Sequence, residues 1–206
     1  MENFVVVIGR QYGAGGRKLG KKLAEKLNVS YYDKELLSEA AKMMGFSPEI
    51  FQKKDEKRPS FIRSMLSFNY GSLNATNSPE TLSDENIYRF QSEVIHSIAK
   101  KGSCVIVGRT ADYILRNHPN LLSVFINAPL EYRAKLITER NDATNHDEAI
   151  EKAKKFDKNR ESYYNYFTNQ HWGRADNYHL TFDSSKFSID QMAEFIVNTL
   201  HTRKIK

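Results

Sequence analysis

The stretch FVVVIGRQYGAGGRKLGKKLAEKL, residues 4–27, decides the fold of this chain. It begins with an apolar run from Phe4 to Ile8, passes through a glycine-rich segment and ends in leucines at helical spacing among lysines. A short β-branched run that ends at a glycine is typical of a strand buried on both faces of a parallel sheet. A strand, a glycine-rich turn and an amphipathic helix in this order indicate the opening of a phosphate-binding α/β unit.

The glycines of this segment have a physical reason. A loop that wraps a phosphate turns successive backbone N–H groups inward, and glycine adopts the required torsions without strain. The amino terminus of the following helix adds a favourable field for an anion. We therefore expect a phosphate cradle, with an ordinary flexible turn as the alternative. Its residues are Arg10, Gln11, Tyr12, Gly13, Ala14, Gly15, Gly16 and Arg17.

The cradle departs from the standard pattern GxxxxGK followed by Ser or Thr. With Gly13-Ala14-Gly15 laid on the GxG part, Arg10 takes the place of the first glycine. Gly16 then takes the place of the lysine, and Arg17 that of the magnesium-binding hydroxyl residue. Arg17 or Lys18 is the cation expected to reach the phosphates, and an arginine would do so through a two-pronged guanidinium instead of a point charge.

Strand and helix patterns alternate along the rest of the chain. We expect further strands at residues 29–32, 104–107, 121–126 and 178–182, separated by amphipathic helices. This order predicts one domain, residues 1–206, with a three-layer α/β/α fold around a parallel sheet of about five strands. Ligands of such folds bind at the carboxyl ends of the strands. The Ser- and Asn-rich segment 45–82 is expected to be a mobile insertion.

Composition narrows the class of protein. The chain has 206 residues, a net charge of 31 − 25 = +6 and one cysteine, Cys104, which excludes an intramolecular disulfide. No apolar run is long enough for a signal peptide or a membrane span, so we expect a soluble, cytoplasmic protein. The positive net charge is compatible with binding of a phosphorylated small molecule, a nucleic acid or a membrane surface. It is also compatible with a solvated lysine-rich surface that binds none of these.

Several segments together resemble the cytidylate kinase-like family of P-loop proteins. They occur in the same order as in bacterial cytidylate kinases and cover most of the chain outside residues 45–82. The segments are IGRQYGAGGRKLGKKLAEKL, YYDKELL, VIVGRTADYIL, VFINAPLEYRAKLITER, FDKNRESYYNYF and NYHLTFDSSKFSIDQMAEFI. The resemblance implies a P-loop NTPase fold.

The resemblance also implies roles for particular residues. Arg109 matches an arginine that contacts the acceptor's phosphate, and Asp157 with Arg160 matches a pair that engages the acceptor's base and phosphate. Arg133 and Arg140 lie in the segment that leads into a lid. Arg17, Lys18, Arg109 and Arg160 are thus the expected catalytic residues, and Asp33, Arg109, Arg133, Arg140, Asp157 and Arg160 the expected substrate-binding residues.

Two larger segments are assigned by the same resemblance. Residues 45–82 fall where these kinases carry their acceptor-binding insertion, although the sequence of this segment does not match theirs. Residues 130–167 fall on the basic helical lid. Arginines on a closing lid neutralise charge and exclude water, which is most of what phosphoryl transfer requires.

Other positions depart from the family. Cytidylate kinases carry an Asp near the metal where this chain has Val107, and Asp33-Lys34-Glu35 replaces their Asp-Ser/Thr-Gly. Cytosine selectivity therefore does not carry over. Asp33 is the remaining acid at a strand end, and it is either a water-mediated magnesium ligand or only a helix N-cap.

These observations predict an ATP- and Mg²⁺-dependent phosphotransferase acting on a nucleoside monophosphate or a similar small acceptor. The expected partner is a nucleotide or another small phosphorylated substrate. The alternative is a weak or inactive nucleotide-binding sensor, because the loop lysine and hydroxyl residue are replaced. Nucleic-acid binding through the lid helix is the least favoured reading, since no nucleic-acid motif accompanies it. The acceptor and the oligomeric state stay open. Core packing is expected for Cys104 and for the aromatic group Tyr163, Tyr164, Tyr166, Phe167 and Trp172.

Overall fold

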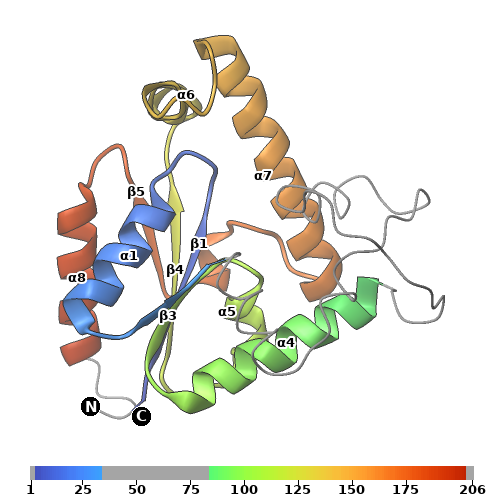
Figure 1. Ribbon diagram of the computed structural model, residues 1–206, viewed down its shortest axis with the longest axis vertical. Coiled ribbons are helices and arrows are strands. Elements are labelled where there is room, and N and C mark those ends of the chain that lie inside the picture. Colours follow the sequence, from blue (N-terminus) through green and yellow to red (C-terminus); the bar gives the residue numbers. More distant parts are fainter. Residues whose placement is uncertain (1–2, 34–83, 203–206) are drawn as a thin grey trace, which may run out of the picture.

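The computed structural model describes residues 3–33 and 84–202. Five parallel strands form one sheet in the order β2-β3-β1-β4-β5. Figure 1 shows this sheet running through the middle of the fold. The strands are β1 (Val5–Arg10), β2 (Ser30–Tyr32), β3 (Cys104–Val107), β4 (Leu121–Asn127) and β5 (Leu180–Asp183). The loop that follows β1 therefore leaves the centre of the sheet.

Helices cover both faces of the sheet (Figure 1). α1 (Gly16–Leu27) and α8 (Ile189–Thr202) pack on one face, and α4 (Asp84–Lys101) with the short α5 (Ala111–Ile114) packs on the other. Alternate residues of β1 divide between the two cores, since Val6 and Ile8 face α1 while Val5 and Val7 face α4. This period of two explains why a wholly apolar strand is buried on both sides.

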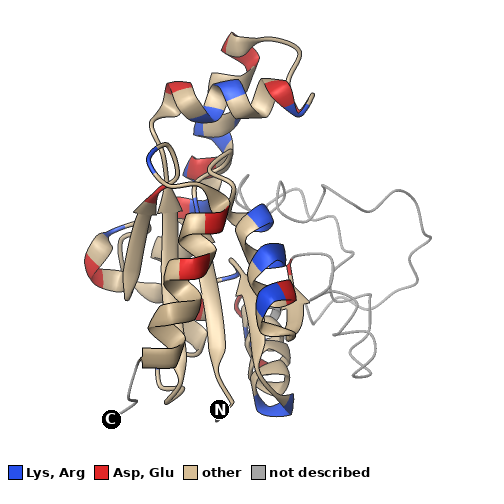
Figure 2. Cartoon of the chain, turned by 90° about the vertical axis from the view of Figure 1, so that its left-hand side faces the viewer, with Lys and Arg blue, Asp and Glu red and all other residues tan. Residues whose placement is uncertain are grey.

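Two further helices stand beyond the carboxyl ends of the strands. α6 (Leu130–Glu139) and α7 (His146–Thr168) pack on each other through a small core of alanines, with Ile137 at its centre. Tyr12 of the loop after β1 contacts this core. The same two helices carry acidic as well as basic positions, as Figure 2 shows, and Lys135 with Glu139 is one ion pair on α6.

Most sequence expectations match these elements. The α/β class and the five-stranded parallel sheet are confirmed, and Ser188 with Gln191 forms a reciprocal cap at the start of α8. The last strand was expected at residues 178–182 but begins at Leu180, because the amide of Tyr178 donates to the carbonyl of Ala175 in the 3-10 turn Ala175–Asn177. The expected insertion 45–82 and the helix that Asp33 would cap lie outside the described residues. In the described part of the chain, no helix is long and apolar enough to cross a membrane.

Candidate active site

The loop between β1 and α1 has the backbone that a phosphate cradle needs. Gly13 and Gly15 both have φ of 86°, in the left-handed region, and α1 begins at Gly16. Gln11 fixes the start of the loop, because its amide donates to the carbonyl of Ile126 and its side chain accepts from the amide of Ala128. The loop is thus tied to β4 before it turns toward the helix.

A buried ion pair holds the middle of the loop. Asp157 of α7 accepts a hydrogen bond from the amide of Tyr12 at 2.7 Å, and Nη1 of Arg133 on α6 donates to the carbonyl of Tyr12 at 2.9 Å. Nη1 of Arg133 also lies 2.6 Å from Oδ2 of Asp157, and its Nε donates to the carbonyl of Ala128. The ring of Tyr12 stacks on Phe156 with 4.5 Å between centroids. These contacts place Arg133 and Asp157 against the loop backbone.

Four arginines converge where the loop meets the ends of β1 and β3. We call Arg10, Arg17, Arg109 and Arg160 the arginine cluster. Nη1 of Arg160 donates to the carbonyl of Arg10 at 3.3 Å. Burial lowers the pKa of Arg10 well below its ordinary value, and the charges of Arg160, Arg17 and Arg109 lower it further. Burial also lowers the pKa of Arg160, against the opposing effect of Asp157. Like charges gathered in this way favour a bound anion.

Arg109 lies in an unusual turn at the end of β3. Gly108, Arg109 and Thr110 have φ of 79°, 63° and 52°, so three successive residues are left-handed. This conformation is strained for residues other than glycine. Gln91 of α4 stabilises it, because Nε2 donates to the carbonyl of Arg109 and Oε1 accepts from Arg109 Nη1 at 3.2 Å. Gln91 therefore fixes both the backbone and the guanidinium of Arg109.

Asp33 is the acidic group nearest the loop on the β2 side. It is buried, accepts a hydrogen bond from the hydroxyl of Tyr31 at 3.2 Å and lies 3.7 Å from Nε of Arg17. Among the described residues, no group of three or more His, Cys, Asp or Glu side chains could hold a metal ion. A single carboxylate fits Mg²⁺ only when most ligands are waters and substrate phosphates, which is the usual manner of this ion.

The remaining expected residues lie around this centre. Arg17 and Lys18 are exposed in the first turn of α1. Arg140 is the C-cap residue that follows α6, and it pairs with Asp142 at 3.1 Å. Asp142 also accepts a hydrogen bond from the hydroxyl of Tyr12. Val107 is buried in the core with its Cγ2 against α1, so this departure from the family pattern gives a packed apolar contact.

Two residues near the site carry no signal in the sequence. Gln91 is a polar position on an amphipathic helix, and nothing in its spacing shows that it meets a turn eighteen residues away. Asp112 follows the Gly108–Thr110 turn and is buried, with the hydroxyl of Tyr164 donating to its Oδ2 at 2.8 Å. Burial raises the pKa of Asp112 to about 6. Tyr163 and Tyr164 are buried as expected, whereas Tyr166 is 61% exposed.

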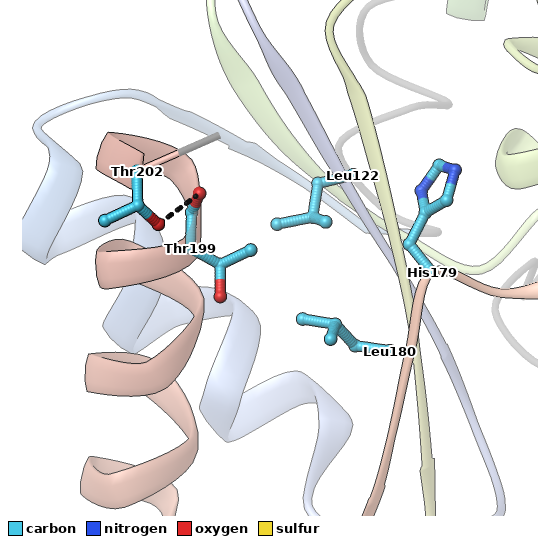
Figure 3. A pocket seen from close by; sticks show the side chains of 5 residues that line it. All are labelled: Leu122, His179, Leu180, Thr199 and Thr202. Atoms are coloured by element: carbon cyan, nitrogen blue, oxygen red, sulfur yellow. Dashed lines mark hydrogen bonds between the residues drawn. The ribbon is translucent and has the colours of Figure 1, made fainter. Parts of the chain in front are cut away.

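A shallow hollow of about 350 Å³ lies at the opposite edge of the sheet. Figure 3 shows its lining from the starts of β4 and β5 and the end of α8. The lining residues are Leu122, His179, Leu180, Thr199 and Thr202. Since the glycine loop lies at the carboxyl ends of the strands, this hollow is not part of the candidate site.

Comparison with known proteins finds similarity in sequence to cytidylate kinases and similarity in fold to other kinases. The model of the cytidylate kinase-like family matches residues 5–186. The cytidylate kinase of Methanosarcina barkeri is 29% identical over 184 residues, which cover 89% of each chain. An uncharacterized protein from Eubacterium ventriosum has a structure with a TM-score of 0.73 and 29% identity, covering 97% of this chain and 99% of the other. Shikimate kinase from Acinetobacter baumannii has the same fold, with a TM-score of 0.52 and 14% identity over 100% of this chain and 97% of the other.

Proposed function

Since the chain belongs to the cytidylate kinase-like family, we propose that it is an ATP-dependent phosphotransferase acting on a nucleoside monophosphate or a similar small phosphorylated acceptor. The observation that carries this proposal is the arginine cluster. Arg10, Arg17, Arg109 and Arg160 gather beside a glycine loop with left-handed Gly13 and Gly15. Two phosphorylated substrates brought together need this excess of positive charge.

The site residues fall into a group that binds the phosphate donor and a group that binds the acceptor. The backbone of residues 10–17 and the start of α1 bind the donor's phosphates, with Arg17 or Lys18 at their exposed side. Arg109, fixed by Gln91, and Arg160 bind the acceptor's phosphate. Because Arg160 also reaches the carbonyl of Arg10, it links the acceptor side to the donor loop. Holding both phosphates in line supplies much of the catalysis of phosphoryl transfer.

Arg133 and Asp157 have a positioning role in this proposal. Both expected substrate contacts are engaged with the backbone of Tyr12. They keep the loop attached to α6 and α7, so that movement of these lid helices moves the loop. Residues 45–82 and Arg140 remain the proposed acceptor-binding insertion and the proposed lid contact.

Mg²⁺ would arrive with the nucleotide and would be held through water by Asp33. The ion supplies neutralisation of phosphate charge when it is bound. Asp33 also sits 3.7 Å from Arg17, so it orients this guanidinium whether or not the ion is present.

A catalytically weak nucleotide sensor is the second candidate. The observation that favours it is the apolar side chain of Val107, which is buried in the core beneath α1. By the resemblance described above, cytidylate kinases carry an Asp at this position. Binding of nucleic acid is not part of either proposal, since acidic positions interrupt the basic ones along α6 and α7 (Figure 2).

The test is release of ADP from Mg-ATP across a panel of nucleoside monophosphates and small phosphorylated or hydroxylated acceptors. Arg17→Ala is the site variant, and Arg174→Ala is the matched control, because Arg174 is an exposed arginine paired with Asp176 outside the cluster. We expect turnover that depends on the acceptor, falls in Arg17→Ala and persists in the control. Saturable nucleotide binding without turnover for any acceptor would refute the kinase proposal for those acceptors and favour the sensor.

A further inference from the structure

The glycine loop carries a positively charged side chain, that of Arg10, at the end of β1 where the standard loop has a glycine. The standard loop has glycine at the end of the strand and lysine at the first residue of the helix. Here the end of β1 is Arg10 and the first residue of α1 is Gly16. Both departures lie in the same loop, six residues apart in the chain.

The structure joins these two departures in space. A Cβ added to Gly16 would lie 2.7 Å from Cβ and 2.8 Å from Cγ of Arg10. Such distances are far below van der Waals contact, and the atoms concerned are the rigid base of the Arg10 side chain. A side chain at residue 16 therefore requires the base of the Arg10 side chain or the loop backbone to shift. Gly16 has no left-handed φ, so the space it leaves is the reason for the glycine.

The Arg10 side chain continues from Gly16 toward β3. A Cβ on Gly108 would overlap Nη1 of Arg10, so the guanidinium lies against the turn that carries Arg109. It is thus placed between the start of α1 and the proposed acceptor side. The carbonyl of Arg10 accepts a hydrogen bond from the guanidinium of Arg160, so a third arginine lies beside Arg10 and Arg109.

We propose that Arg10 and Gly16 have exchanged the roles of glycine and lysine in the phosphate loop, so that Arg10 supplies its phosphate-binding cation from the strand side. This inference rests on the proposed phosphotransferase function, because it names the cation of the same site. A guanidinium presents a planar fork of donors, so it can bridge two phosphate oxygens where an ammonium meets a phosphate as a point charge. The ligand class is a polyphosphate chain.

The test measures binding of inorganic tripolyphosphate by titration calorimetry, which requires no turnover. Arg10→Met keeps the aliphatic stem against Gly16 and removes the charge. We expect its affinity to fall about 10- to 100-fold, the loss of a charge-assisted hydrogen-bonding group. Arg116→Met is the matched control, since Arg116 is an exposed arginine on the Tyr113 ring, and its affinity should not change.

The exchange itself is tested by rebuilding the standard loop. Gly16→Lys alone should lose tripolyphosphate binding, because the new side chain collides with Arg10. The double variant Arg10→Gly with Gly16→Lys should bind at least tenfold more tightly than Arg10→Gly alone, as expected when one phosphate-binding cation replaces another. A circular dichroism melt of each variant separates loss of fold from loss of binding.

Two results would overturn the inference. One is wild-type affinity in Arg10→Met, and the other is a folded double variant that binds no better than Arg10→Gly. The outcome is separable from that of the proposed function. If tripolyphosphate binding depends on Arg10 but no acceptor supports turnover, the proposed phosphotransferase function is refuted and the role of Arg10 is supported. If turnover is seen but Arg10→Met binds tripolyphosphate with unchanged affinity, the role of Arg10 is refuted and the phosphotransferase function is supported.

Discussion

Nη1 of Arg133 lies 2.6 Å from Oδ2 of Asp157, and the two side chains hold the amide and the carbonyl of Tyr12. Their side chains are only 7% and 14% exposed. One pair from α6 and α7 therefore fixes the midpoint of a loop that follows β1. The strength of a buried pair is seen when one partner is removed, because the other charge is then left without compensation.

Asp157→Asn should destabilise the protein by about 3 kcal/mol, since Arg133 would keep a buried charge without its carboxylate. The amide oxygen of Asn can still accept from Tyr12, so the substitution keeps the bond to the loop and removes the charge and the acceptor that face Arg133. The free energy of unfolding in urea measures it. Asp176→Asn is the matched control, because it breaks an Arg–Asp pair whose partners are each 61% exposed. That change should cost no more than about 1 kcal/mol. An equal loss of stability in Asp157→Asn and Asp176→Asn would refute the stabilising role of the buried Arg133–Asp157 pair.

Gln91→Leu should weaken acceptor binding and leave the donor site intact. The change removes the two hydrogen bonds that hold the carbonyl and guanidinium of Arg109 in the left-handed turn. A hydrogen bond to a charged group contributes about 1.5–3 kcal/mol, so the KM for the acceptor should rise roughly tenfold or more.

The expected split is a raised acceptor KM with an unchanged KM for ATP. Steady-state kinetics with an acceptor identified by the panel gives both constants. Ser92→Ala is the neighbouring control, since that hydroxyl bonds the carbonyl of Tyr88 within α4. An equal rise in both KM values would argue against a role specific to Arg109.

Gly20→Ala should destabilise the protein even though alanine favours a helix by about 1 kcal/mol over glycine. A Cβ at residue 20 would lie 2.7 Å from Cγ2 of Val107 and 2.9 Å from the ring of Tyr31. Overpacking of this kind costs about 1–3 kcal/mol. Urea unfolding of Gly20→Ala, Val107→Ala and the double variant measures the coupling, and the double variant should lose less than the sum of the two. Strict additivity would contradict the contact.

The order of strands and helices was predictable from the sequence because each of these elements depends on local sequence patterns. The apolar run before Gly9 and the helical spacing after Gly16 each extend over only a few residues. Patterns of this range are read directly from sequence. The start of β5 was misplaced by two residues, because the turn hydrogen bond at Tyr178 leaves no pattern of its own.

The sequence named candidate site residues and did not predict their contacts. It named Arg109 and Arg160 as candidates, and in the structure both interact with Arg10. It did not predict that Arg133 and Asp157 would meet the backbone of Tyr12, more than 100 residues earlier. Such contacts depend on how α6 and α7 pack against the loop, and no period in the sequence encodes that geometry.

Asp112 should make the stability of this protein depend on pH between about 4 and 6. Burial raises the pKa of its carboxyl to about 6, whereas an unfolded Asp titrates near 3.9. Below about pH 4 both states are protonated. As the pH rises toward 6 the unfolded chain loses this proton first, so the native state binds more protons and loses relative stability. The loss is complete above pH 6 and amounts to about 3 kcal/mol.

Asp112→Asn removes this contribution, because an amide does not titrate and its oxygen can still accept from Tyr164. The free energy of unfolding of the variant minus that of the wild type should therefore increase from pH 4 to pH 6.5. Other carboxyl groups titrate in the same range, but they are shared by both proteins and cancel in the difference. A difference for Asp112→Asn that stays constant across the range would show that this carboxyl titrates normally in the folded protein.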